Sequence, residues 1–342
     1  MFKFNGSLSK MGRTRTDSDA DERAAGMKIL VTAPNSDLGR KVLAELLAPE
    51  FSVRVMAPRP SCLPEHILEQ VELFCGAVDD STTLCRALDG VEALFWSVPL
   101  ECLRKTDAQA WYERCARAAC AAIRETRTQR VVTISNGGNA VAGPISPACC
   151  AVEDILNRSG AAIRHLRCGW FMENFLRQAR GICGYGVLSY PLPGDIALPM
   201  VAARDVAETI LRCLVRRDWT GVRGLLVRGP EDLSFTRVAS IIERVLDRPV
   251  QFTEIPLDQF IREAVRAGVN VQYARHLAQS FSKLIQSNPR AETRRVDLTA
   301  PTTLARWTKD ELLPIMKLFS PQVAPAGFRD GLDNSEPEIS FP

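Results

Sequence analysis

The stretch MKILVTAPNSDLGRKVLAELL, residues 27–47, decides the fold. It begins with a short, mostly apolar run of the kind found in buried strands, and from Leu38 on its apolar residues recur at helical spacing. A strand that passes into a helix through a loop ending in glycine, here Gly39, is typical of the first unit of a dinucleotide-binding sheet. The stretch therefore predicts that the chain opens with a Rossmann-like α/β unit.

Strand-like and helix-like segments keep alternating after this unit. Mostly apolar runs occupy residues 51–57, 71–78, 92–98 and 130–136, and helical patterns near 81–88 and 107–126 separate the later runs. Apolar runs of this kind are typical of strands that helices cover on both sides. We predict an α/β fold with a doubly wound parallel sheet and right-handed crossovers. Ligands of such sheets bind at the carboxyl ends of the strands. This rule predicts that the segments at the strand ends line one crevice; they are residues 32–39, 57–60, 97–100 and 135–138.

In the second half of the chain, strand-like and helix-like segments no longer alternate regularly. This mixed pattern predicts a smaller C-terminal lobe. Residues 181–199 are rich in Gly and Pro and are expected to be too irregular for a core, and Ser234 is expected to cap a helix. The domain boundaries that we predict are a disordered leader over 1–26, a dinucleotide-binding core over 27–160, remaining core strands interleaved with a mixed α/β substrate lobe over 161–320, and a flexible tail over 321–342.

The overall composition argues against several classes of protein. The 342 residues carry a formal net charge of +3 with acids and bases interleaved, which gives no field for nucleic-acid binding. No apolar run approaches the roughly 20 residues that cross a bilayer, and the N-terminus has no signal-peptide run. The 11 cysteines show no metal-ligand spacing, and the three histidines lie far apart. We therefore expect a cytoplasmic protein without a metal.

Several separate stretches carry a family resemblance. They are LRCGWFMENF at 166–175, MVAARDVAETI at 200–210, GPEDLSFTRVASIIERVLDRPV at 229–250 and TAPTTLARWTKDELLP at 299–314. Together with the loop at 27–47 they resemble the NmrA-like family of atypical short-chain dehydrogenases, in consistent order from Lys28 to Leu318. The resemblance implies an NAD(P)-binding core with a smaller lobe, acting on small molecules or sensing the nucleotide.

The phosphate loop departs from that family's Gly-x-x-Gly-x-x-Gly pattern. Its three positions are Ala33, Ser36 and Gly39, so that only the third glycine remains. We expect Ala33 to be tolerated if its φ stays negative, and Pro34 to restrict Ala33 to extended conformations. Ser36 adds a side chain where the backbone should meet phosphate, and the charge of Asp37 would repel a pyrophosphate. Alternatively, Asp37 only caps the helix.

The fold and the resemblance together predict the cofactor-binding residues. Arg59, which follows Pro58 at the end of the second strand, could bind a ribose 2′-phosphate and favours NADP over NAD, although it could equally be a solvated loop residue. Ser135 and Asn136 end a strand and could bind cofactor or substrate. The full set that we predict is Thr32, Ala33, Asn35, Ser36, Leu38, Gly39, Arg59, Ser97, Val98, Ser135, Asn136, Trp170 and Phe171.

The catalytic residues of ordinary short-chain dehydrogenases are missing. Residues 135–160 contain neither the tyrosine nor the lysine of a Tyr-x-x-x-Lys pair, and Cys149 stands where the resemblance places a lysine. A buried carboxylate among aromatic residues could act as an acid, which makes Glu173 a candidate. Tyr185 and Tyr190 are the nearest tyrosines that could reach the site as acids, and Cys149 is a further candidate with structural packing as its alternative.

Three functions follow from these observations. The favoured one is a small-molecule enzyme of secondary metabolism that carries out NADPH-dependent reduction. The alternatives are a cofactor-independent cyclase, isomerase or dehydratase that reuses the fold, and a non-catalytic NAD(P)-sensing regulator. We expect NADP(H) as cofactor, with its loss left open. The expected partner is a small-molecule substrate, and a homodimer is possible. We expect no binding to nucleic acid or to a membrane.

Overall fold

The computed structural model describes residues 26–98, 105–135, 147–286 and 297–319. The predicted leader before Gly26, the predicted tail and Asn136 lie outside the described residues, as does the side chain of Cys149.

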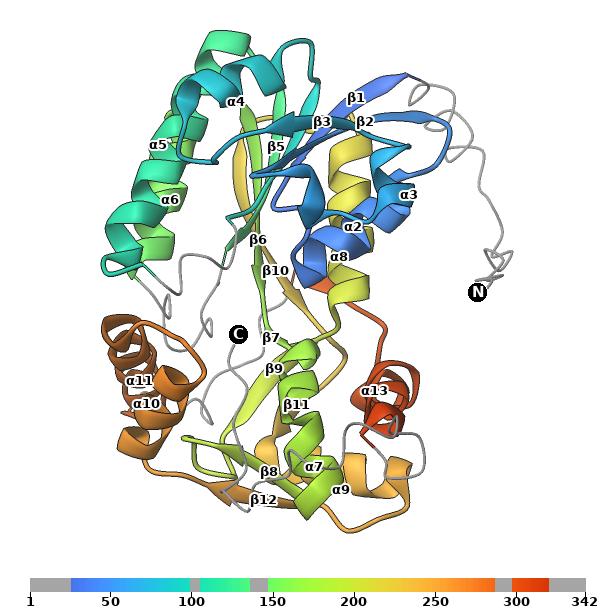
Figure 1. The fold of residues 1–342 in the computed structure, drawn as a ribbon, viewed down its shortest axis with the longest axis vertical. Helices are drawn as coiled ribbons and strands as arrows, with labels where there is room; N and C mark the ends of the chain where they lie inside the picture. Colours follow the sequence, from blue (N-terminus) through green and yellow to red (C-terminus); the bar gives the residue numbers. More distant parts are fainter. Residues whose placement is uncertain (1–25, 99–104, 136–146, 287–296, 320–342) are drawn as a thin grey trace.

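Strands from both halves of the chain build a parallel sheet of eight strands in the order β13-β10-β6-β5-β4-β1-β2-β3, which is the sheet of the first domain (Figure 1). Every strand pairs with its neighbours in parallel, and the order reverses between β1 and β4. The predicted doubly wound sheet is therefore confirmed. Its strands are β1 (Met27–Thr32), β2 (Phe51–Ala57), β3 (Glu72–Cys75), β4 (Ala93–Trp96), β5 (Arg130–Ser135), β6 (Ala162–Cys168), β10 (Val222–Arg228) and β13 (Leu298–Thr299).

Helices cover both faces of this sheet. One face carries α4 (Ser81–Leu88), α5 (Ala108–Thr126) and α6 (Pro147–Asn157), and the other carries α2 (Asp37–Leu46), α3 (Glu65–Leu68) and α8 (Ala203–Val215) (Figure 1). Strand β1 shows why both faces are buried: Ile29 and Val31 pack on the α2 and α8 side, and Leu30 packs on the other. A short 3-10 helix, η1 (Pro60–Cys62), follows β2.

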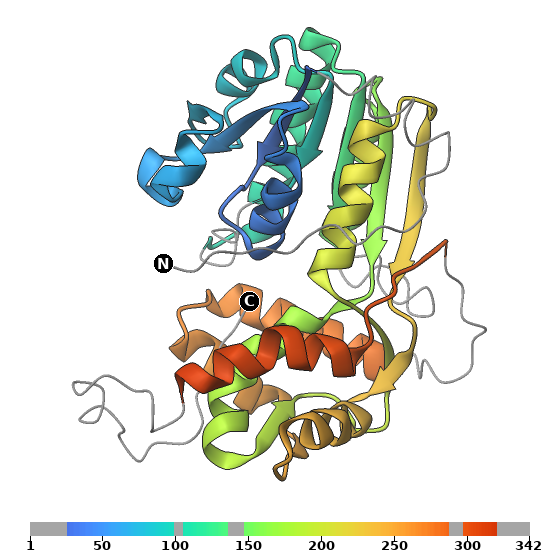
Figure 2. The same ribbon diagram turned by 90° about the vertical axis from the view of Figure 1, so that its right-hand side faces the viewer.

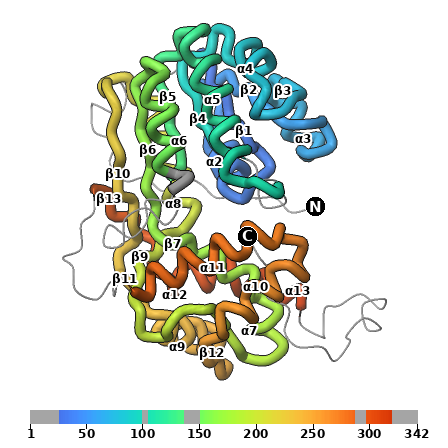
Figure 3. The backbone as a smooth tube through the Cα atoms, turned by 90° about the vertical axis from the view of Figure 1, so that its left-hand side faces the viewer, coloured from blue at the N-terminus to red at the C-terminus, as the bar shows by residue number. Residues whose placement is uncertain are grey.

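The second lobe lies beyond the carboxyl ends of the strands (Figures 2 and 3). It holds two small sheets, β11-β9-β7 and β12-β8. Its strands are β7 (Trp170–Phe171), β8 (Val187–Tyr190), β9 (Ala197–Val201), β11 (Asp232–Ser234) and β12 (Gln251–Glu254). Its helices are η3 (Met172–Gln178), α7 (Ala179–Tyr185), α9 (Phe235–Leu246), α10 (Leu257–Arg266), α11 (Val271–Gln286), α12 (Leu304–Trp307), the π-helix η5 (Thr308–Leu312) and α13 (Leu313–Leu318). Ser234 caps α9 as predicted, since its hydroxyl accepts from Arg237 N.

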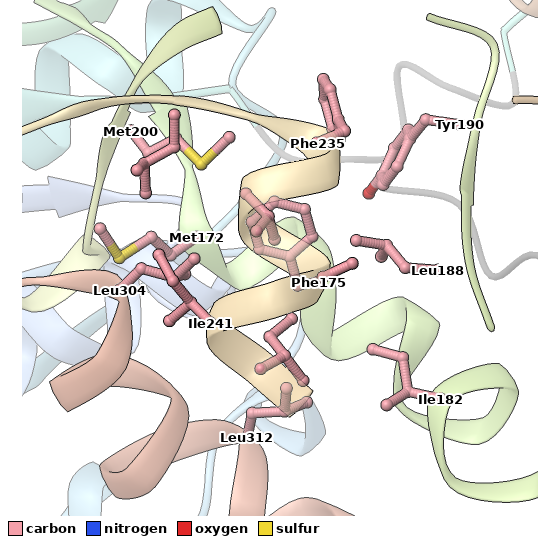
Figure 4. Packing of buried hydrophobic residues seen from close by; sticks show 14 of the residues in the cluster. Met172, Phe175, Ile182, Leu188, Tyr190, Met200, Phe235, Ile241, Leu304 and Leu312 are labelled. Carbon is pink, nitrogen blue, oxygen red and sulfur yellow. The ribbon is translucent and has the colours of Figure 1, made fainter. Parts of the chain in front are cut away.

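The prediction that residues 181–199 are too irregular for a core is wrong. Six side chains of this segment are buried in the core of the second lobe: Ile182, Leu188, Tyr190, Leu192, Ile196 and Leu198. Figure 4 shows Ile182, Leu188 and Tyr190 beside Phe175 and Phe235. The cause is long-range pairing, because β8 pairs with β12 and β9 with β11 and β7. A local pattern of Gly and Pro cannot reveal such partners.

Two ion pairs join the C-terminal segment to the helices of the first domain. Lys41 Nζ on α2 lies 2.9 Å from Glu311 Oε1, and Arg204 Nη1 on α8 lies 2.9 Å from Asp310 Oδ2. Asp310 and Glu311 both belong to η5. The π-helix thus contacts α2 and α8, and α2 is the helix that the phosphate loop precedes.

Candidate functional site

The phosphate loop runs from Ala33 to Ser36, between β1 and α2. Ala33 adopts the left-handed conformation with φ of 51°, which corrects both the expectation of a negative φ and that of an extended conformation before Pro34. The turn causes this conformation, because Ser36 N donates to Ala33 O at 3.2 Å and Ser36 Oγ donates to the same oxygen at 2.9 Å. The loop therefore forms a turn that usually requires glycine, with alanine in that place.

Gly39 allows this turn to pack against the helix. A Cβ on Gly39 would lie 2.3 Å from Ala33 O, a contact that real side chains do not make. Ser36 is the N-cap of α2, and its Oγ accepts from Gly39 N at 3.0 Å. The side chain of Ser36 thus folds back onto its own helix, in contrast to the expectation that it would occupy the phosphate position.

The amino end of α2 presents backbone donors. Within the part of the chain that the structure describes, the amides of Asp37 and Leu38 have no acceptor, as expected for the first turn of a helix. Asp37 forms an ion pair with Arg40, and its charge also acts on the half-buried Arg177 of η3. Burial lowers the pKa of Arg177, and the attraction of Asp37 partly offsets that shift. Two arginines thus lie near the negative charge that we expected to repel a pyrophosphate: Arg40 in an exposed ion pair, and Arg177 at longer range.

Other predicted cofactor residues lie at neighbouring strand ends. Thr32 Oγ1 donates to Ser97 O and accepts from Ser97 N, both at 2.7 Å, which ties the end of β1 to that of β4. Val98 is buried against the α5 face. Asn35 is exposed, and its carbonyl accepts from Arg40 Nη1 at 2.6 Å. Leu38 packs into the core on the α2 side, so its side chain contributes packing and only its amide faces outward.

Arg59 is exposed at the end of β2. Its carbonyl accepts from Cys62 N in the short helix η1, which holds its backbone in place. Among the described residues its guanidinium has no hydrogen bond or ion pair. Such a side chain is available for a phosphate from solvent.

A polar network that the motif analysis missed surrounds Ser135 on the α6 face. Glu153 of α6 accepts from Arg167 of β6 in bidentate fashion, at 3.1 Å from Nε and 2.6 Å from Nη2, and also from the Ser135 hydroxyl. Burial would raise the pKa of Glu153, but the hydrogen bonds from Arg167 and Ser135 outweigh burial and lower it. The available signal was Arg167, a charged residue between apolar neighbours in the stretch LRCGWF at 166–171.

Trp170 and Phe171 form β7, where the chain enters the second lobe. The Trp170 ring contacts Tyr190, Phe235 and Phe281, with centroid distances of 5.4, 5.6 and 6.3 Å. Phe171 instead packs against the core of the first domain. The two predicted cofactor residues therefore belong to opposite sides of the junction between the lobes.

Among the catalytic candidates whose side chains the structure describes, Glu173 and Tyr190 hydrogen-bond within the protein and Tyr185 is exposed. Both oxygens of Glu173 lie 3.0 Å from Ala203 N, and its Oε1 accepts from Trp307 Nε1 at 3.1 Å, while burial raises its pKa. Tyr190 is buried in the second lobe and donates to Asn174 O at 3.2 Å, and Tyr185 is 60% exposed at the end of α7. In the described part of the chain we find no group of three side chains suited to a metal and no helix long and apolar enough to cross a membrane.

Comparisons with known proteins agree with this geometry. A reductase of Streptomyces griseus, named for (4-alkanoyl-5-oxo-2,5-dihydrofuran-3-yl)methyl phosphate, is 32% identical over 280 residues, which covers 80% of this chain and 90% of that protein. The NAD(P)H azoreductase of Xenophilus azovorans is 25% identical over 264 residues, 76% of this chain and 87% of its own length.

The fold also matches solved structures. The triphenylmethane reductase of Citrobacter sp., solved with NADP(H), has a TM-score of 0.69 at 17% identity and covers 82% of this chain and 99% of its own. The model of the NmrA-like family matches residues 26–293, which include the phosphate loop, the sheet from β1 to β10 and most of the second lobe. The chain therefore belongs to the NmrA-like family, with its Rossmann NAD(P)-binding fold.

Proposed function

We propose that the protein is an NADPH-dependent reductase of a small organic molecule. The observation that carries the proposal is the phosphate loop, which makes the required turn although two glycines are replaced. Its left-handed Ala33, the close approach at Gly39 and the open amides of Asp37 and Leu38 form the kind of anion site that holds a pyrophosphate at a helix N-terminus.

The residues around the loop fit a dinucleotide that carries a 2′-phosphate. Arg40 pairs with Asp37, and the charge of Asp37 also acts on Arg177, so positive charge lies close to the one carboxylate of the loop. The guanidinium of Arg59 is free to bind a phosphate at the end of β2. The hydrogen bond between Thr32 and Ser97 joins the carboxyl ends of β1 and β4, the two strands between which the strand order reverses. Bound NADPH would supply a hydride there.

The expected substrate has an electron-poor double bond. The chain contains no Tyr-x-x-x-Lys, and in the structure Glu173 and Tyr190 already hydrogen-bond within the protein. A delocalised anion formed by hydride addition can take its proton from water and does not need a strong acid in the site. Substrate, NADPH and a proton from water would then give the reduced product and NADP+. The names of the two relatives, an oxo-dihydrofuran phosphate reductase and an azoreductase, support this substrate class and a role in secondary metabolism.

The test measures binding before turnover. Calorimetric titration should give a dissociation constant for NADPH below that for NADH. Incubation with α,β-unsaturated lactones and azo compounds should then consume NADPH in step with product. Absence of NADPH binding at millimolar ligand would refute the proposal. Turnover of these substrates by cofactor-stripped protein would support the cofactor-independent enzyme instead.

A further inference from the structure

The Ser135 hydroxyl contacts the carboxylate of an ion pair between a buried Glu153 and a partly exposed Arg167. Ser135 ends β5, and the strand register places it opposite Arg167 of β6. Both residues contact the carboxylate of Glu153, which comes from the helix that covers them. The Glu153 side chain is only 12% exposed and Ser135 is buried, so the contact between these two side chains is shielded from water, whereas the Arg167 side chain is 42% exposed.

The chemistry of the three groups determines the direction of the hydrogen bond. Glu153 is ionised because Arg167 and Ser135 hold its pKa below the ordinary value, and an ionised carboxylate only accepts. The Ser135 proton therefore lies toward Glu153. A hydroxyl has one proton and two lone pairs, so Ser135 can offer a ligand only its lone pairs.

The place of Ser135 in the sheet indicates which part of a ligand it meets. The order β5-β4-β1 puts it two strands from the phosphate loop. With strands about 4.8 Å apart, this distance is roughly 10 Å. A dinucleotide whose pyrophosphate rests on α2 and which crosses the point of reversed strand order would bring its nicotinamide half to this strand end.

We propose that Glu153, locked by Arg167, is a positioning residue that turns Ser135 into a hydrogen-bond acceptor for a donor on the nicotinamide half of NADPH. The donor is the carboxamide N–H or a hydroxyl of the adjoining ribose. Ser135 accordingly recognises the cofactor and does not donate to a substrate oxygen. This inference rests on the proposed function, since it requires that the dinucleotide binds.

A second polar bridge offers a matched control. His165 of β6 lies 2.9 Å from Thr133 Oγ1 through Nδ1 and 2.8 Å from Asn157 Oδ1 through Nε2. Asn157 ends α6, so this bridge also ties α6 to the sheet. Asn157→Ala removes a structural link of the same helix without touching Ser135 or Glu153.

The experiment compares binding of NADPH with binding of adenosine 2′,5′-bisphosphate, which lacks the nicotinamide riboside. The variants are Ser135→Ala, Glu153→Gln and the double variant. In Glu153→Gln the single amide oxygen must face Arg167, so the amide N–H₂ donates to one lone pair of Ser135. The Ser135 proton then has no carboxylate to hold it and can turn toward the donor on the ligand, which opposes the proposed hydrogen bond. Each single variant should weaken NADPH binding roughly fivefold, the loss of one hydrogen bond. The double variant should lose no more than either single one.

The same variants should bind the bisphosphate as the wild type does, and Asn157→Ala should lower the thermal midpoint without changing either dissociation constant. Losses that add in the double variant, or that appear equally with the bisphosphate, would overturn the inference, because they indicate a general loosening of α6. NADPH binding that is unchanged in all variants would overturn it as well and leave the reductase proposal intact. A wild-type protein that binds neither ligand would refute the dinucleotide site itself.

Discussion

The carbonyl oxygen of Ala33 lies 2.3 Å from the point that a Cβ on Gly39 would occupy. This carbonyl also accepts both the amide and the hydroxyl of Ser36, so it cannot move without breaking the turn. The third glycine of the loop is therefore required by the left-handed conformation of Ala33 and by the start of α2 together.

Gly39→Ala should damage both stability and cofactor binding. The added methyl must displace the Ala33 carbonyl, and overpacking of this kind costs about 1–3 kcal/mol. We expect a lower free energy of unfolding in urea and a loss of measurable NADPH binding. Glu45→Ala, at an exposed position of the same helix, is the control. A Gly39→Ala protein with wild-type stability and affinity would show that the turn relaxes freely.

Arg59→Ala should reduce the preference for NADP. Removing a charge-assisted hydrogen bond to the 2′-phosphate costs about 1.5 kcal/mol or more, which is about tenfold in affinity. The dissociation constant for NADPH should rise accordingly while that for NADH stays the same. Because Arg59 is exposed, the thermal midpoint should not change. An equal loss for both dinucleotides would contradict a 2′-phosphate contact.

Glu173→Gln should change how stability depends on pH. Burial raises the pKa of Glu173 in the folded protein above its ordinary value of 4.5. The folded state thus binds this proton more tightly than the unfolded chain. The stabilisation that results is complete below pH 4.5 and is lost as the pH rises through the raised pKa. The stability of the wild type relative to the Gln variant, measured by urea unfolding, should fall over that interval. A relative stability that rises with pH there would contradict the shift.

Tyr190→Phe separates packing from acid catalysis. The hydroxyl donates to Asn174 O inside the second lobe, and its loss should cost about 1 kcal/mol of stability. The turnover number for an accepted substrate should stay within a factor of two. A fall of about a hundredfold or more would instead match the loss of a general acid and would support the catalytic role predicted from the sequence.

Much of the first domain follows from local patterns. The apolar runs at β1, β2, β4 and β5 and the helical spacing after Leu38 predicted strands and helices that the structure confirms. These features are local, because burial on both faces imposes continuous apolar runs and a helix imposes its own period. The irregular pattern of residues 181–199 led to a wrong prediction because the strands that pair with β8 and β9 lie far along the chain.

The sequence by itself determined the doubly wound sheet, the place of the phosphate loop and the presence of Gly39 at its end, because apolar runs, helical spacing and the glycine are local features of the chain. Only the structure decided that Ala33 is left-handed, which is why Gly39 is needed, and that the charge of Asp37 acts on Arg177 as well as on Arg40. The same holds for Glu153 and Glu173, whose partners Arg167, Ser135 and Trp307 come from other elements. A buried carboxylate takes its charge and its role from such contacts, which spacing along the chain does not encode.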